Sequence, residues 1–502
     1  MKNVLRSCNL PIRAGWLVGC LALASLAISS CTSTAEQPEF NPDRWAPRAT
    51  ETEWDAAGSG QRVSVDVDST VGPFRMSSRP TPAGAEYDLP ALIDLALRQN
   101  PETRGSWEAA RGAAAGWSIK RAPFYPLVGV SSDSGYERSV DLVPKHWGTL
   151  KNWQSVDQFT LEYVLVDFGR RDAAAESARE QLIAANFRFN REIQNTVFAV
   201  ERSFYLLDAE RAGLKAANAI VALAETDRRA VEKRHALGLA TKPDLLLAQQ
   251  RESQAQYQLQ DAELEVSNAQ ADLAVAVGLR VDSMPPVQNV GAVNIPATLS
   301  ESVEDLINDA IRERPDLAAS VSSFRAREAN AALARADMYP VLSFASDYGI
   351  HAFNYRLSNP TTPQYTAMAP EYAAMLTLRW DVFAGMEHLN TIYQADDDRE
   401  SERAHVRALE IDVAGQVWRA YYAFQTAVRR YHYAEALLAA SQSAYDSNLR
   451  SYNRGLATIV DLLTADRDIA DAKYTTIQSR AQVLISAVAV AYSVGTISPS
   501  SK

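Results

Sequence analysis

Apolar positions follow a helical period in two unusually long stretches of the chain. One runs from Arg171 to Leu237 and the other from about Glu387 to Arg454, and neither contains a proline. At about 1.5 Å per residue, a helix of this size is roughly 100 Å long, far longer than a compact domain requires. In the second stretch the apolar residues are separated by steps of three and four, which predicts a coiled-coil seam. The seam residues are Val406, Leu409, Val413, Val417, Ala420, Phe424, Ala427, Tyr431, Ala434 and Leu438.

Before each long stretch the apolar period changes to two, which predicts β-strands. The alternating segments are residues 127–137, 159–166, 342–351 and 376–382. We expect a loop that contains Pro144, His146 and Trp147 between the first two segments. A soluble antiparallel sheet and a membrane barrel with a polar lumen both show this alternation. Four strands cannot close a membrane barrel, so a barrel would require several copies of the chain.

The same order of features occurs twice along the chain. Pro101 and Pro315 are 214 residues apart, and so are the Tyr-Pro pairs that begin at Tyr125 and Tyr339. Farther along, LGLATKPDLLLAQ begins at residue 237 and RGLATIVDLLTAD begins 217 residues later. Landmarks that recur in order at a nearly constant shift indicate an internal duplication.

The two GLAT motifs predict the tips of helical hairpins. Gly238 and Gly455 are expected to end the long helices, because glycine adopts the left-handed conformation easily. Thr241 and Thr458 can cap the helices that follow, and an acid three residues on, Asp461 in the second motif, favours the positive helix start. Both tips are therefore expected at the end that is far from the strands.

The N-terminus has the pattern of a secretory signal over residues 1–30, with basic residues followed by an apolar stretch. Small residues before Cys31 resemble the lipidation motif of bacterial lipoproteins, and Cys20 is the less favoured alternative. Residues 31–85 are rich in polar residues and proline, so we expect a lipid-anchored extension there. The expected domains after it are one repeat over 86–290 and another over 300–498.

Charge and motif content exclude several classes of function. The formal net charge is −11, and removal of a basic leader makes it −14, so nucleic acid is not an expected partner. The six histidines have no metal-ligand spacing, and phosphate loops and nucleophile motifs are absent from the sequence. The acidic run Asp396–Asp398 is expected to be a solvated helix face. We therefore expect neither an enzyme nor a cofactor.

Four motifs occur in each half of the chain. They are the openings ALRQNP and AIRERP, the Tyr-Pro pairs, the strand exits VDFGRR and VFAG, and the GLAT turns with their Asp-Leu-Leu. By these motifs the chain resembles the TolC-type outer-membrane efflux factors over residues 86–498. The resemblance implies a mainly α fold with a membrane β-barrel, in which coiled-coil hairpins and four strands per chain form a trimeric α/β barrel.

The resemblance also implies a function and a set of partners. The chain would form a homotrimer in outer-membrane lipid, with a long periplasmic extension, and would act as a passive duct for drugs, other small toxic molecules or metal ions. A periplasmic adaptor and an inner-membrane transporter would complete the export system. A duct for type I protein secretion and a non-conducting coiled-coil scaffold remain the alternatives. The adaptor-docking residues implied are Gly238, Leu239, Ala240, Thr241, Gly455, Leu456, Ala457 and Thr458.

The family resemblance places the pore gate at Asp461 and Tyr452. Three copies of Asp461 would form an anionic ring that favours cations, although helix capping alone is the competing interpretation of this residue. The chain departs from some family members at Thr464, where they have a second acid, and at Ala457, where they have an arginine that latches the gate.

Overall fold

The computed structural model describes residues 86–143, 146–290, 301–357 and 365–497. The expected signal peptide, Cys31 and the extension up to residue 85 lie outside the described residues. The first half contains α4 (Leu89–Gln99), α5 (Pro101–Arg121), the short helix η1 (Ala122–Phe124), β1 (Leu127–Val143), β2 (His146–Val166), α6 (Arg170–Ala236) and α7 (Lys242–Val277). A short helix η2 (Val281–Ser283) precedes α8 (Val303–Glu313), α9 (Pro315–Ala336), β3 (Val341–Leu357), β4 (Tyr365–Arg379), α10 (Glu387–Asn453) and α11 (Ile459–Val494).

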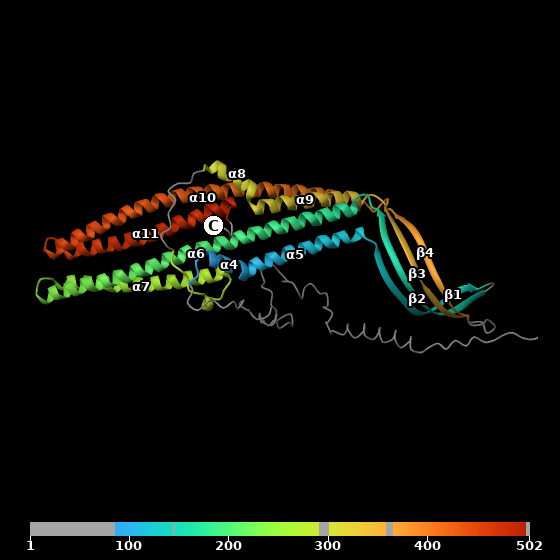
Figure 1. Cartoon of the computed structure of the whole chain (residues 1–502), viewed down its shortest axis with the longest axis horizontal. Coiled ribbons are helices and arrows are strands. Elements are labelled where there is room, and N and C mark those ends of the chain that lie inside the picture. The colour runs from blue at the N-terminus through green and yellow to red at the C-terminus, as the bar shows by residue number, and fades with distance from the viewer. Residues whose placement is uncertain (1–85, 144–145, 291–300, 358–364, 498–502) are drawn as a thin grey trace, which may run out of the picture. The chain divides into compact units, whose positions relative to one another are not determined.

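The two halves have the same order of elements, with two helices, two strands, a long helix and a return helix in each. In residues 86–497 the strands lie at one end of the helices, and the turns α6–α7 and α10–α11 lie at the other end (Figure 1). The long helices α6 and α10 each contain 67 residues. The predicted long helices, four strands and internal duplication are therefore confirmed.

Each half begins with a helix that is interrupted by proline. Asn100 and Arg314 have extended backbone angles before their prolines, because proline disfavours the helical conformation in the residue that precedes it. Each interruption packs against the glycine that ends the return helix of the same half. A Cβ on Gly278 would lie 2.7 Å from Asn100 Cα, and one on Gly495 would lie 3.2 Å from Arg314 Cα. A side chain would therefore clash at Gly278 and be tightly packed at Gly495, and the positive φ of both residues also favours glycine.

The helices pack around three apolar clusters. One cluster contains Val197, Val200 and Leu273 and joins α4, α6 and α7. A second cluster joins α8, α10 and α11, and the third lies near the hairpin tips. The coiled-coil seam predicted in α10 supplies the second cluster through Val413 and Val417, both of which are fully buried. Removing such a side chain from water stabilises the packed state by about 1.5–3 kcal/mol.

The four strands form one antiparallel sheet in the order β1-β2-β3-β4. The register aligns a row of large side chains across the sheet, namely Val130, Phe159, Tyr348 and Tyr372. These four residues are all exposed in the single chain. The adjacent row on the other face contains Gly129, Thr160, Asp347 and Ala373. The predicted apolar and polar faces are therefore present, and no described element covers the apolar one.

The strand ends differ from the sequence-based prediction. The expected loop is wrong at His146 and Trp147, which belong to β2, because β1 continues to Val143 and pairs there with His146. Pro144 lies outside the described residues. Polar side chains in this part of the sheet do not interrupt the ladder, because its hydrogen bonds join peptide groups. The last strand ends at Arg379 rather than at residue 382. The strands contain 15 to 21 residues, more than the nine to eleven that a bilayer requires.

Among the described residues, α11 is long and apolar enough to cross a membrane by length and composition alone. A core helix can pass the same test. Helix α11 packs along α10 and α6, and it contains the fully buried acid Asp466.

Candidate functional site: the hairpin tips and the contact between the hairpins

The two hairpin tips have the same backbone geometry. Gly238 and Gly455 follow the long helices with φ angles of 72° and 74°, in the left-handed region that favours glycine. The amide of Leu239 donates to the carbonyl of Arg234 at 2.8 Å, and the amide of Leu456 makes the equivalent bond at 2.9 Å. These bonds satisfy carbonyl groups that a helix end would otherwise leave without a partner. The predicted helix ends are confirmed.

Both return helices begin with a capping box. The Thr458 hydroxyl accepts a hydrogen bond from the Asp461 amide at 3.3 Å. Oδ2 of Asp461 accepts from the amide and the hydroxyl of Thr458 at 2.9 and 2.7 Å. The same box joins Thr241 to Asp244 in the first tip. The hydrogen bonds from the Thr458 hydroxyl and amide hold the pKa of Asp461 below its usual range, so this exposed carboxylate stays ionised in mildly acidic solution.

The tips expose leucine and turn alanine inward. Leu239 and Leu456 are 66% and 79% exposed, respectively. Ala240 and Ala457 are partly buried against the third apolar cluster. A single exposed leucine is ordinary on a protein surface. Two glycine-leucine tips at the same end of the helices, however, provide a repeated apolar contact point (Figure 1).

Tyr452 lies in the packed interior of the chain, with 6% of its surface exposed. The guanidinium of Arg234 lies 4.5 Å from the centre of the Tyr452 ring, and its NH1 donates to the Tyr452 carbonyl at 3.2 Å. Burial raises the pKa of Tyr452. These contacts join the end of α6 to the end of α10. Position 457, where some family members have an arginine, is alanine in this chain. Arg234 of the other hairpin supplies a guanidinium group near Tyr452 instead.

A buried ion pair joins the two hairpins beyond the tips. Nε of Arg251, on α7, donates to Oδ2 of Asp466, on α11, at 2.7 Å. The side chains of Arg251 and Asp466 are 8% and 0% exposed. Asp227 on α6 and Tyr445 on α10 are also buried and interact electrostatically with this pair. All four hairpin helices thus contribute to one polar cluster.

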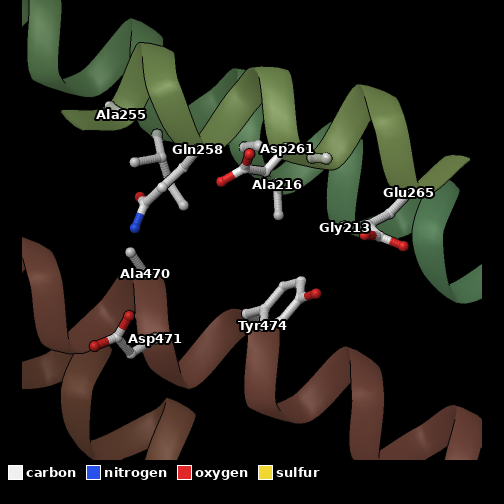
Figure 2. Close-up of a pocket in the computed structure, with 12 residues that line it drawn as sticks. Gly213, Ala216, Ala255, Gln258, Asp261, Glu265, Ala470, Asp471 and Tyr474 are labelled. Carbon is white, nitrogen blue, oxygen red and sulfur yellow. The ribbon is translucent and has the colours of Figure 1, made fainter. Parts of the chain in front are cut away.

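A groove lies between the hairpins, with α6 and α7 on one side and α11 on the other (Figure 2). Its cavity of about 210 Å³ is lined by small residues together with Asp261, Glu265, Asp471 and Tyr474. This is smaller than the roughly 300–1,000 Å³ of typical ligand pockets. In the part of the chain that is described, no cluster of three or more histidine, cysteine or acidic side chains could hold a metal ion. The groove therefore offers no built ligand site within one copy of the chain.

Sequence reasoning singled out the tips but missed the contacts between the hairpins. Arg251 lies between Ala248 and Ala255 on the buried face of α7, and Asp466 lies between Leu462 and Ile469 on α11. The sequence did contain a signal for this contact, because the helical period places the charged residues Arg251 and Asp466 on the buried faces of their helices. It could not identify the partner, because the two residues are 215 positions apart.

The fold and the tips together define a class of protein. A sheet with one uncovered apolar face, joined to coiled-coil hairpins whose tips lie at the far end, is the architecture of an outer-membrane channel with a helical extension. The chain belongs to the outer membrane efflux protein family, whose model matches residues 92–279 and 306–496. The protein is therefore an outer-membrane channel of an export system, in a family of passive channels rather than enzymes.

Individual relatives agree with this family. Protein CyaE of Bordetella pertussis is 27% identical over 420 residues, which cover 83% of this chain and 86% of the relative. The pyoverdine export outer membrane protein OpmQ of Pseudomonas aeruginosa is 24% identical over 78% of this chain and 82% of the relative. The solved structure of the outer-membrane channel OprN has the same fold, with a TM-score of 0.72 at 18% identity, and covers 81% of this chain and 89% of that one.

Proposed function

We propose that three copies of the chain close their sheets into one twelve-stranded barrel that spans the outer membrane. The observation that supports this most strongly is the open sheet, in which β1 pairs only with β2 and β4 only with β3 among the described strands, so that each has one unpaired edge. In lipid, each unpaired peptide group costs several kcal/mol, so a membrane sheet must close. Pairing β1 of one copy with β4 of the next satisfies both edges, and the exposed apolar row through Phe159 and Tyr348 then faces lipid.

The oligomeric state can be tested on the protein in mild detergent. Light scattering or native mass spectrometry should give the mass of three protomers, and the same sample should conduct ions in a planar bilayer once its tips are loosened. A monomer that conducts would contradict the shared barrel. A trimer that never conducts would instead favour the coiled-coil scaffold.

The hairpin tips dock a periplasmic adaptor that connects the channel to an inner-membrane transporter. Glycine, leucine, alanine and threonine recur at both tips, and the exposed leucines Leu239 and Leu456 present an apolar point on each. Replacing both leucines with aspartate should abolish copurification with an adaptor after chemical crosslinking. Leu264, an exposed leucine on α7 far from the tip, provides the matched control.

The exported cargo is a class of small molecules, and the energy for its export comes from the inner-membrane transporter. One relative is named for the export of pyoverdine, and the expected lipid anchor also favours efflux over protein secretion. Deletion of the gene should lower resistance to toxic small molecules and leave the secreted proteome unchanged. Loss of a secreted protein without a change in resistance would favour the secretion duct.

Asp461 caps its helix and also faces the pore in the trimer. The two roles are compatible, because Oδ2 makes both capping bonds and the other carboxylate oxygen can face the aqueous path. Capping also keeps the carboxylate ionised, which maintains an anionic ring of three. Tyr452 contributes to the gate from inside the protomer, by holding the second hairpin against Arg234. The first tip chiefly docks, whereas the second docks and gates.

Channel measurements can distinguish a role of Asp461 in the pore from its role as a helix cap. Asp461→Asn retains a side-chain oxygen that can accept capping bonds but removes the charge, so cation selectivity should fall while the trimer stays intact. Asp244→Asn makes the same change in the first tip and should leave selectivity unchanged. Equal selectivity in the wild type and Asp461→Asn would remove Asp461 from the pore.

The lipid anchor at Cys31 is a separate proposal that rests on the residues before this cysteine. Intact-mass analysis of the mature protein should show acylation at Cys31 and loss of residues 1–30. Cleavage at another position would refute the anchor without affecting the proposed barrel.

A further inference from the structure

A polar cluster lies buried between the two hairpins, although a coiled-coil core is normally apolar. Asp227, Arg251 and Asp466 are only 6%, 7% and 0% exposed. They come from α6, α7 and α11, and Tyr445 of α10 completes the cluster. The ion pair of Arg251 with Asp466 accounts for one oxygen of Asp466. Oδ1 of Asp466, Oδ2 of Asp227 and one terminal nitrogen of Arg251 are buried without a hydrogen-bond partner.

The charges in the cluster do not balance. Two carboxylates share one guanidinium, and the guanidinium lies against Asp466 at 2.7 Å. Asp227 is therefore left as the excess negative charge in a region from which water is largely removed. Burial, followed by repulsion from Asp466, raises the pKa of Asp227 to about 6, and the attraction of Arg251 only partly opposes this. A proton on Asp227 neutralises the cluster.

Other charged groups near the cluster do not supply the missing positive charge. Arg228, the neighbour of Asp227 on α6, is engaged by Glu232 and Glu252 at 2.8 and 2.6 Å. On α10, Tyr445 and Tyr452 both have raised pKa values, chiefly through burial, and so stay neutral. Arg234 lies against the Tyr452 ring. Arg251 is thus the cation that faces Asp227 and Asp466.

We propose that Asp227, Arg251 and Asp466 form a proton-binding site that holds the two hairpins of a protomer together near their tips. A protonated Asp227 becomes a hydrogen-bond donor, and the unpaired carboxylate oxygen of Asp466 is an acceptor in the same cluster. Above the pKa of Asp227 the site buries a net negative charge, and the hairpins separate more readily. The site thus makes the cohesion of the hairpins depend on pH, independently of any adaptor or cargo.

The sign and size of the effect follow from the change in pKa. When the hairpins separate, Asp227 meets water and its pKa returns toward 3.8, the ordinary value. The packed state therefore binds more protons than the separated state, so cohesion falls as pH rises from about 4 to about 6 and is constant above that range. A difference of about two units changes the equilibrium between the two states by up to about 100-fold.

The duplication shows that the cluster is not a common feature of both halves. At the shift of 217 that relates the tips, Asp227 corresponds to Ala444 and Arg251 corresponds to Asp468. Asp466 corresponds to Gln249. The site therefore occurs once per protomer. Asp466 is eight residues beyond the cap Thr458, about 12 Å along α11. The site therefore holds the first turns of α11, next to the second tip, against the first hairpin.

Hydrogen exchange of the full-length protein in detergent tests the proposal. After correction for the intrinsic exchange rate, peptides from the first turns of α7 and α11 should exchange up to about 100-fold faster at pH 7.5 than at pH 4.5. Asp227→Asn cannot ionise and keeps a donor for Asp466, so it should exchange slowly at both values. Glu225→Gln, a change two residues away on α6 at a partly exposed acid that pairs with Arg229, should retain the wild-type dependence. Identical pH dependence in the wild type and Asp227→Asn would overturn the proposal.

Infrared titration provides a readout of the proton itself. In a chain that carries Glu201→Gln, a protonated carboxyl group should titrate with a midpoint near pH 6, and this component should be lost when Asp227→Asn is added. Because burial also raises the pKa of Glu201 to about 7, all samples should carry Glu201→Gln. A titration that is unchanged by Asp227→Asn would contradict the site even if that variant altered hairpin packing.

Discussion

At the residue scale, the two tips share a backbone but differ in the side chains that support them. His235 and Tyr452 occupy equivalent positions, 217 residues apart. In the first tip, Nδ1 of His235 lies 2.9 Å from the carbonyl oxygen of Ala240, so the contact stays within the turn. In the second tip, Tyr452 packs against Arg234 of the other hairpin. One turn is thus supported locally, and the other is coupled to its neighbour.

The threonine caps lead to a first prediction. Thr458→Ala removes the hydroxyl that accepts from the Asp461 amide, so the first turn of α11 should lose about 1 kcal/mol of stability. Hydrogen exchange of that turn should rise accordingly, while the strands stay protected. Thr464→Ala is the matched control, because its hydroxyl only donates back to the Val460 carbonyl within the helix. Equal effects of the two variants would argue against the cap.

Glu201 gives a second prediction, on pH dependence. Burial raises its pKa to about 7 from an ordinary 4.5. The folded state therefore binds the extra proton, and stability falls as pH rises from about 4.5 to about 7 and then levels off. Glu201→Gln should raise the thermal midpoint at pH 8, by an amount that corresponds to at most about 3 kcal/mol, and should have little effect at pH 4. A stabilisation that is the same at both pH values would rule out this ionisation as its cause.

At the element scale, the buried ion pair of Arg251 with Asp466 is one of the contacts that hold the hairpins together. Breaking a buried pair on one side leaves a charge without compensation, which typically costs about 3–5 kcal/mol, whereas replacing both partners with apolar residues can be neutral. Arg251→Met should therefore loosen the contact between α7 and α11 more than Arg251→Met combined with Asp466→Leu. Hydrogen exchange of α7 and α11 measures the difference.

The exposed pair on α11 provides the reference for that comparison. Arg467 lies 3.7 Å from Asp471, and both side chains are about two-thirds exposed. Arg467→Met should leave hairpin exchange unchanged, because surface pairs contribute little. If Arg251→Met also left the hydrogen exchange of α7 and α11 unchanged, the buried pair would have no part in holding the hairpins together.

At the scale of the whole molecule, the sheet faces give a prediction about membrane insertion. Phe159 belongs to the exposed apolar row, whereas its neighbour Thr160 lies on the polar face beside Asp347. Phe159→Arg should therefore impair insertion, by about 2–4 kcal/mol if the residue lies near the middle of the bilayer. Thr160→Arg should insert normally and change conductance instead. Fractionation of outer membranes, followed by bilayer recording, distinguishes the two variants, and the reverse result would invert the assignment of the faces.

Much of the fold could be predicted, because its determinants are local. The steps of three and four in α10 and the duplicated GLAT turns depend on residues a few positions apart, and the structure agrees with both. The strand ends could not be predicted as well. The sequence predicted a loop with Pro144, His146 and Trp147, yet β1 continues to Val143 and β2 already begins at His146. Pairing with a neighbouring strand outweighed the local preference there.

The sequence alone determined the helices, the two tips, the alternation of the strands and the duplication, since each depends on short-range chemistry or on a repeated pattern. Only the tertiary structure decided which side chains meet across the hairpins. Arg251 and Asp466 are 215 positions apart, and Arg234 and Tyr452 are 218 apart. Their contacts depend on how four helices pack, and no local spacing encodes them. The ionisation of Asp227 likewise depends on burial by distant segments, because water would otherwise keep its carboxylate charged.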